Sequence, residues 1–170
     1  MKDGITTDAL PPYLLNYFTK ARGRTVQDAL EASLQRTASL YRSIPEERGT
    51  YRYADGKWSI KEVLQHITDA ERIFAYRALR FARNDSTVLA PYEENEYAPA
   101  SEADRLALSI LLDDHRATRG STITLFNSFS PAMLVRRGAA GANVVSVEQL
   151  GFIIAGHAEH HCDILQQRYL

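Results

Sequence analysis

Apolar residues recur at steps of three and four over long stretches of this chain, and this helical spacing constrains its fold more than any other feature. The clearest stretch begins at Ser59, where Glu62 completes the sequence pattern of a capping box. The apolar series that follows is that of a helix with one buried face: Ile60, Val63, Ile67, Ala70 and Phe74. We therefore expect a long helix over residues 59–83.

Three further stretches show the same spacing. One covers residues 25–43, one begins at Ser101, and one begins at Ser146 and reaches almost to the C-terminus. Gln149 supplies the last of them with another capping box. Four long amphipathic helices predict an all-α four-helix bundle.

A shorter helical pattern precedes these four. It follows Pro11 and Pro12 and stops at Arg22 and Gly23, so we expect a short extra helix at the N-terminus. In this interpretation residues 1–24 are an appended segment. Residues 25–170 then form a single domain.

The connections between the long helices contain most of the irregular sequence. Residues 84–100 hold two prolines and an acidic, aromatic stretch, and we expect a long loop there. Residues 131–145 form a second irregular connection, for which a hairpin is one option, and residues 50–57 favour a brief extended segment. Because long loops often carry function, Tyr92, Glu93 and Glu94 are candidates to line the entrance of a site; plain solvent exposure is the alternative.

Composition excludes several classes of protein. Lys and Arg number 20 and Asp and Glu 21, for a formal charge of −1, so no global field attracts nucleic acid or an anionic membrane. Neither a signal-peptide pattern nor the run of roughly 20 apolar residues that spans a bilayer is present. The single cysteine, Cys162, excludes internal disulfides and a multi-cysteine metal site. We expect a cytoplasmic protein without nucleic-acid or membrane partners.

Two histidines of the last helix occupy successive positions on an otherwise aliphatic stripe. His157 and His161 differ in direction by only about 40° and are offset by about 6 Å along the axis, so both imidazoles can face one ion. A divalent cation would accept a lone pair from each buried neutral ring. Two hydrogen-bonded histidines without a metal would give the same spacing.

His66, on the helix over residues 59–83, can also face the bundle interior. It would complete a three-histidine site with open coordination positions, the arrangement of a catalytic metal. His160 points about 60° to the side of His157, and we expect it at the flank of the site. His115 lies in the charged run DDHR, and we expect it to be solvated.

Two segments of this chain resemble signatures of the DinB/YfiT-like metalloprotein superfamily. Residues 57–77, KWSIKEVLQHITDAERIFAYR, are similar to its second-helix signature, and residues 146–165, SVEQLGFIIAGHAEHHCDIL, to its last-helix signature. The resemblance implies an up-down-down-up bundle that often forms a homodimer. It also implies a divalent metal, nickel or zinc, held by His66, His157 and His161.

The same resemblance implies a range of activities. The superfamily includes transferases that use low-molecular-weight thiols such as bacillithiol or mycothiol, an isomerase of the maleylpyruvate type, and members with no known reaction. We therefore expect a metal-dependent enzyme that activates a thiol or a water against a small-molecule substrate, as a thiol S-transferase or a hydrolase does. The alternatives are a non-catalytic, metal-binding or stress-associated dimer, and a bundle with structural histidines that works through an interface.

Charged residues are candidates for the surroundings of the site. Asp69 and Glu159 could accept hydrogen bonds from the ligand imidazoles, with surface salt bridges as the alternative. Arg136 and Arg137 could pair with a substrate carboxylate or phosphate, with solvation as the alternative. Arg77, at an inward position of its helix, either forms a buried ion pair or reaches into the pocket.

Overall fold

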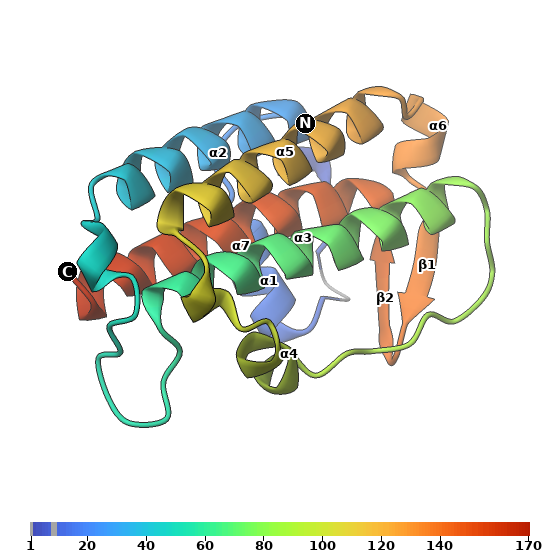
Figure 1. The fold of residues 1–170 in the computed structure, drawn as a ribbon. Helices are drawn as coiled ribbons and strands as arrows, with labels where there is room; N and C mark the ends of the chain where they lie inside the picture. Colours follow the sequence, from blue (N-terminus) through green and yellow to red (C-terminus); the bar gives the residue numbers. More distant parts are fainter. Residues whose placement is uncertain (1, 8–9) are drawn as a thin grey trace.

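The computed structural model describes residues 2–7 and 10–170, and four long helices within these residues form a bundle. They are α2 (Val26–Arg42), α3 (Ile60–Ala82), α5 (Leu108–Asn127) and α7 (Val147–Arg168). Figure 1 shows α2 and α7 running in one direction and α3 and α5 in the other. The predicted all-α bundle is confirmed, with its up-down-down-up order.

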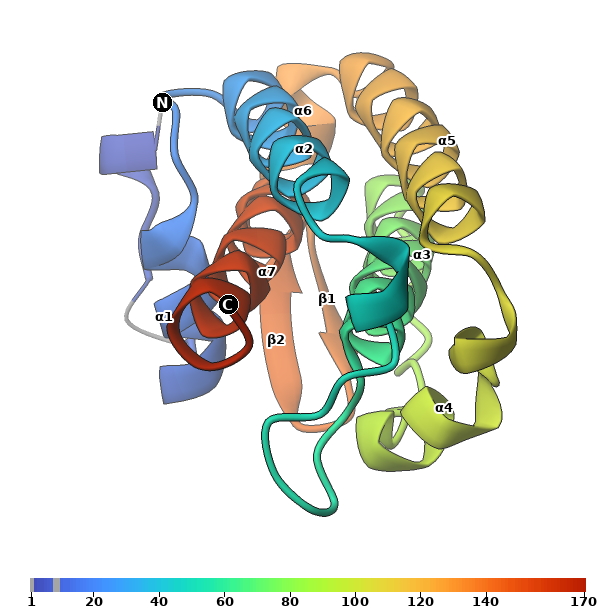
Figure 2. The ribbon, with the colours of Figure 1, turned by 60° about the vertical axis from the view of Figure 1, so that its left-hand side comes forward.

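Helices α7 and α5 each pack against both α2 and α3 (Figure 2). Because α5 runs parallel to α3, the chain must return along the bundle between them. The return contains α4 (Glu94–Ala100) and the 3-10 turn η3 (Ala103–Arg105). The expected loop over residues 84–100 is therefore partly helical. The expected helix start at Ser101 is wrong, because Glu102 adopts a left-handed φ of 49° and α5 begins only at Leu108.

Side-chain caps fix where three of the long helices begin. The predicted boxes of Ser59 with Glu62 and of Ser146 with Gln149 each form both of their hydrogen bonds. Thr25 forms a third box with Asp28, in which aspartate takes the place of the usual Glu or Gln. These contacts satisfy backbone N–H groups that the first helical turn leaves without partners.

The expected short N-terminal helix is α1 (Pro12–Lys20), which packs against α7. The two helices approach closely because Gly156 of α7 has no side chain. A Cβ at this position would lie 1.6 Å from the carbonyl oxygen of Tyr17. The 3-10 turn η1 (Lys2–Gly4) precedes α1, while Met1, Asp8 and Ala9 of the expected segment lie outside the described residues. The domain boundary at residue 24 stays a prediction.

The connection before α7 contains α6 (Pro131–Leu134) and an antiparallel hairpin of β1 (Arg137–Ala140) and β2 (Asn143–Ser146). The hairpin that was one option for residues 131–145 is therefore present. Residues 50–57, which follow the 3-10 turn η2 (Glu46–Arg48), form turns around Gly56 rather than the expected extended segment. Among the described residues, no helix combines the length and apolarity needed to cross a bilayer.

The buried apolar residues form two clusters along the bundle. Residues of α7 up to Ala155 belong to one cluster, and those from Ala158 onward belong to the other. His157 therefore stands at the boundary between them.

Candidate metal centre

The structure brings together three imidazoles from two helices. His66 of α3 faces α7, and its Nε2 lies 3.0 Å from Nε2 of His157. His161, one turn further along α7, places its Nε2 3.1 Å from the same atom of His157. The side chains are nearly inaccessible, with exposed fractions of 5%, 4% and 8% in sequence order. Their spacing allows all three to ligate one ion.

Burial keeps these imidazoles neutral. It lowers the pKa of His66 to about 4 and holds the pKa values of His157 and His161 well below 6.5. The neighbouring imidazoles lower the pKa values of His157 and His161 further. At neutral pH each ring therefore keeps a lone pair for a ligand bond.

Hydrogen bonds among the three rings cannot account for this arrangement. A neutral imidazole has one N–H and one lone pair, yet Nε2 of His157 faces two other Nε2 atoms at once. One lone pair cannot accept two well-directed hydrogen bonds. With metal–nitrogen bonds of about 2.1 Å, ligand nitrogens lie about 3.0 to 3.4 Å apart. The three donor atoms lie within 4.8 Å of one another, and the two separations from His157 match this range, so the donor set fits a divalent metal ion.

Aromatic rings surround the three imidazoles. The ring of Trp58 lies 4.6 Å from that of His66 between centroids, and the ring of Tyr17 meets that of His157 edge-on at 5.0 Å. The ring of Phe74 also meets that of His157 edge-on, at 6.3 Å between centroids. Tyr17 was not among the candidate site residues from sequence. Its contribution arises from the packing of α1 on α7.

A cavity of about 460 Å³ opens beside His157. Its wall is built by α1, α3, the hairpin and residues 91–95, and it includes Tyr92, Glu93 and Glu94 at the positions expected to line an entrance. A smaller cavity of about 220 Å³ reaches His161 from the side of Trp58. A small molecule can thus approach His157 from the larger cavity and His161 from the smaller one.

Of the arginines singled out from sequence, only Arg77 lines this cavity among the described residues. Its Nη2 donates to the carbonyl of Ala90 at 2.9 Å, so it reaches into the pocket rather than forming an ion pair. Arg136 donates to the carbonyl of Ala82 at the end of α3. Arg137 donates to Val144 across the hairpin at 3.2 Å. Both of these arginines thus contact the backbone and neither lines the cavity, so their place at a substrate stays a prediction.

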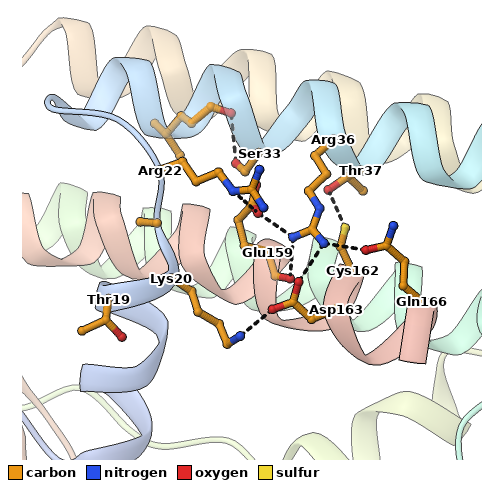
Figure 3. A network of polar contacts seen from close by, with 12 residues as sticks. Thr19, Lys20, Arg22, Ser33, Arg36, Thr37, Glu159, Cys162, Asp163 and Gln166 are labelled. Carbon is orange, nitrogen blue, oxygen red and sulfur yellow. Dashed lines mark hydrogen bonds and ion pairs between the residues drawn. The ribbon is translucent and has the colours of Figure 1, made fainter. Parts of the chain in front are cut away.

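The acidic candidates do not contact the ligand imidazoles. Glu159 of α7 forms an ion pair with Arg36 of α2 at 2.6 Å (Figure 3). A residue two positions after His157 is turned by about 200° around the helix, which explains why Glu159 faces away from the site. Asp69 pairs with Arg72 at 3.4 Å on the surface of α3.

The structure also places the two residues that flank His161 in the sequence. His160 lies at the flank, as expected, with its ring 5.3 Å from that of Tyr17. Cys162 is buried, and its sulfur lies 3.5 Å from Oγ1 of Thr37 on α2 (Figure 3). Burial raises the pKa of the Cys162 thiol, which is directed toward α2.

His115 is buried, contrary to expectation. It has no exposed surface, its Nδ1 lies 3.4 Å from the hydroxyl of Thr68, and burial lowers its pKa to about 4. The charged run around it occupies one side of α5, while His115 and Arg119 point into the bundle. Arg119 forms a two-pronged ion pair with Glu71, at 2.8 and 2.9 Å, which the sequence analysis missed. No local pattern distinguishes these charges from surface ones.

Comparison with known proteins gives relatives of similar kind. The model of the DinB superfamily matches residues 29–165. A protein named "Putative metal-dependent hydrolase" from Halalkalibacterium halodurans is 25% identical over 136 residues, which cover 78% of this chain and 77% of the relative. Another of that name from Geobacillus thermodenitrificans is 26% identical over 144 residues, which cover 81% and 75%.

Solved structures share the fold at low identity. YfiT from Bacillus subtilis, described as "a probable metal-dependent hydrolase with an unusual four-helix bundle topology", has a TM-score of 0.71 at 14% identity, covering 96% of this chain and 90% of that one. The mycothiol-dependent maleylpyruvate isomerase has a TM-score of 0.67 at 12% identity, covering 94% of this chain and 62% of that one. With the family match over most of its length, this chain belongs to the DinB superfamily.

Proposed function

We propose that this protein is a metal-dependent enzyme of the hydrolase type, in which His66, His157 and His161 hold one divalent ion. The convergence of their Nε2 atoms, at 3.0 and 3.1 Å around His157, is the observation that carries the proposal. Nickel and zinc are the metals we favour, since both accept imidazole ligands.

The chain prepares this site in three ways. Burial keeps the imidazoles deprotonated, so no proton competes for the ligand lone pairs. Trp58 and Tyr17 hold the rings in place. The cavity of about 460 Å³ leaves room for a substrate beside His157. A divalent ion with three neutral ligands would supply a full +2 charge that lowers the pKa of a water to about 7, or deprotonates a thiol.

Two reaction classes remain candidates. Hydrolysis is favoured by the names of the relatives that share about a quarter of their residues with this chain. Thiol transfer is the second candidate, suggested by the shared fold with the mycothiol-dependent isomerase. The low-molecular-weight thiol, the homodimer and the cytoplasmic location stay predictions.

Elemental analysis of the purified protein tests the metal site. We expect one divalent ion per chain after incubation with zinc or nickel and removal of the excess. His157→Ala should lose the ion, because the central ligand is gone. His160→Ala is the matched control: it removes a neighbouring imidazole of the same helix that is not among the converging three. Full occupancy in His157→Ala, or none in the unaltered protein, would overturn the site.

Turnover measurements then separate the reaction classes. Ester, amide and phosphoester substrates are assayed without thiol, and electrophilic substrates with cysteine as the thiol, each with and without chelator. Chelator-sensitive hydrolysis without thiol supports our proposal. Turnover that requires the thiol supports the second candidate, and metal-loaded protein inactive on the whole panel supports a non-catalytic, metal-binding role.

A further inference from the structure

We propose that the cavity beside His157 takes a small molecule with a carboxylate and an apolar body, and that Arg77 recognises the carboxylate. This inference rests on the proposed function in so far as the bound molecule is the substrate of the same site. The binding itself depends on side chains of the cavity and is tested separately.

Arg77 is buried with most of its hydrogen-bonding capacity unused. Its exposed fraction is 9%, and a guanidinium carries five N–H donors. Within the described part of the chain, its one hydrogen bond is that to the carbonyl of Ala90, and it has no carboxylate within ion-pair distance. Arg119, the other buried arginine, instead donates to Glu71, Leu30 and Ser33. Burying a charge without a partner is costly in free energy, and an anion bound in the cavity would supply Arg77 with that partner.

The position of the guanidinium is suited to a planar anion. Its central carbon lies 5.7 Å from the ring centroid of Phe74 and 5.9 Å from that of Tyr92. Contacts with ring faces hold an arginine in place while leaving N–H groups at its edge free to donate. A carboxylate can accept two such bonds side by side, which a lysine could not offer in the same geometry.

Two acidic residues line the same cavity and must be weighed against Arg77. Glu93 turns its carboxylate to the start of α4, where it accepts from the backbone and the side-chain amide of Asn95 at 3.1 and 3.0 Å. Burial, with the nearby charge of Glu93, raises the pKa of Glu94 above its ordinary value. Neither carboxylate forms an ion pair with Arg77, whose guanidinium therefore keeps N–H groups free for an anionic group of a ligand in the cavity.

The rest of the lining describes the body of the ligand. Apolar and aromatic side chains contribute much of the wall: Tyr13, Leu14, Phe74, Val145 and Leu150. Because His157 lines the same cavity, a molecule held by Arg77 would lie close to this imidazole. This places a carboxylate at one part of the substrate and the reacting group at another.

Isothermal titration calorimetry with three matched compounds tests the inference: 3-phenylpropionate, its neutral amide 3-phenylpropionamide, and the cation 3-phenylpropylamine. We expect the carboxylate to bind at least about tenfold more tightly than the amide, because one charge-assisted pair is added. Stronger binding of the amine, or no measurable binding of the carboxylate, would overturn the proposal.

Substitutions at Arg77 test whether this residue causes the preference for the carboxylate over the amide. Arg77→Met should weaken binding of the carboxylate about tenfold to a hundredfold and change that of the amide less than about twofold. Arg77→Lys, which keeps the charge and loses the fork, should fall between the two and serves if the methionine variant does not fold. Arg72→Met is the control, because Arg72 lies on the same helix and pairs with Asp114 at the surface.

The titrations are repeated on metal-free protein and on His157→Ala. A carboxylate preference that persists without metal and disappears in Arg77→Met supports the inference, even if elemental analysis overturns the metal site. A preference that requires the metal and is unchanged in Arg77→Met means that the ion binds the carboxylate. That outcome overturns the inference and leaves the proposed function standing.

Discussion

Two of the groups of buried polar side chains among the described residues are built on different principles. In the first, Arg119 donates to both carboxylate oxygens of Glu71 and to the backbone of α2 at Leu30. Burial alone would raise the pKa of Glu71, but Arg119 holds it below its ordinary value. The positive and negative groups of this network satisfy each other within the protein.

The second group consists of like parts. His66, His157 and His161 present the same atom to one another, and their neutral rings cannot pair fully. Inside a protein such a group is costly unless something else completes it. The contrast teaches that burial of polar residues does not by itself mark a site; a mismatch between donors and acceptors does.

The largest effect is expected from breaking the self-satisfied network. Glu71→Ala leaves Arg119 buried without its partner and should lower the free energy of unfolding by roughly 3 to 5 kcal/mol. Asp69→Ala is the matched control, since it removes another carboxylate of α3 paired with an arginine at the surface, worth less than about 1 kcal/mol. Urea unfolding followed by circular dichroism measures both. Equal losses in the two variants would remove the distinction drawn here.

The histidine group should respond to an added ion rather than to loss of a protein partner. Zinc at a hundred times its dissociation constant should raise the free energy of unfolding by about 2.7 kcal/mol, because it binds the folded chain. The increase should be absent in His66→Ala and present in His160→Ala. An unaltered unfolding midpoint with zinc, in protein shown to bind it, would contradict this assignment.

The smallest expected effect is the loss of folding stability at low pH. The pKa of His115 is about 4 in the folded chain and near 6.5 when unfolded, so the unfolded state binds the proton first as the pH falls. Stability is complete above about pH 6.5 and declines toward pH 4; at pH 5 the loss due to His115 is about 2 kcal/mol.

Comparison of metal-free protein with His115→Leu isolates this contribution, because the ligand histidines titrate in both. The variant should show a shallower decline of the unfolding free energy between pH 7 and pH 5. Parallel curves would mean that His115 does not carry the predicted share.

Local features of the structure could be predicted well. The caps at Ser59 and Ser146 depend on residues three positions away, so the sequence contains both partners of each contact. The phase of α7 likewise places His157 and His161 on one face. The same phase places Glu159 on the opposite side, which helical geometry alone would have indicated.

Other features depend on partners far along the chain. His115 and Arg119 lie in a polar stretch, and their burial follows from the packing of α5 against α2 and α3. Arg119 meets Glu71 across 48 residues of sequence. The wall of the cavity contains Tyr17 only because Gly156 lets α1 approach α7.

The sequence by itself determined the helical class, several helix ends and the pair of imidazoles on one stripe, because each of these depends on periodicity within a few turns. The tertiary structure decided that His66 meets His157 across 91 residues, and which charges lie in the core. It also decided that Arg77 faces a cavity rather than a carboxylate. Such outcomes depend on how whole helices are packed and directed, and no local pattern of residues encodes that choice on its own.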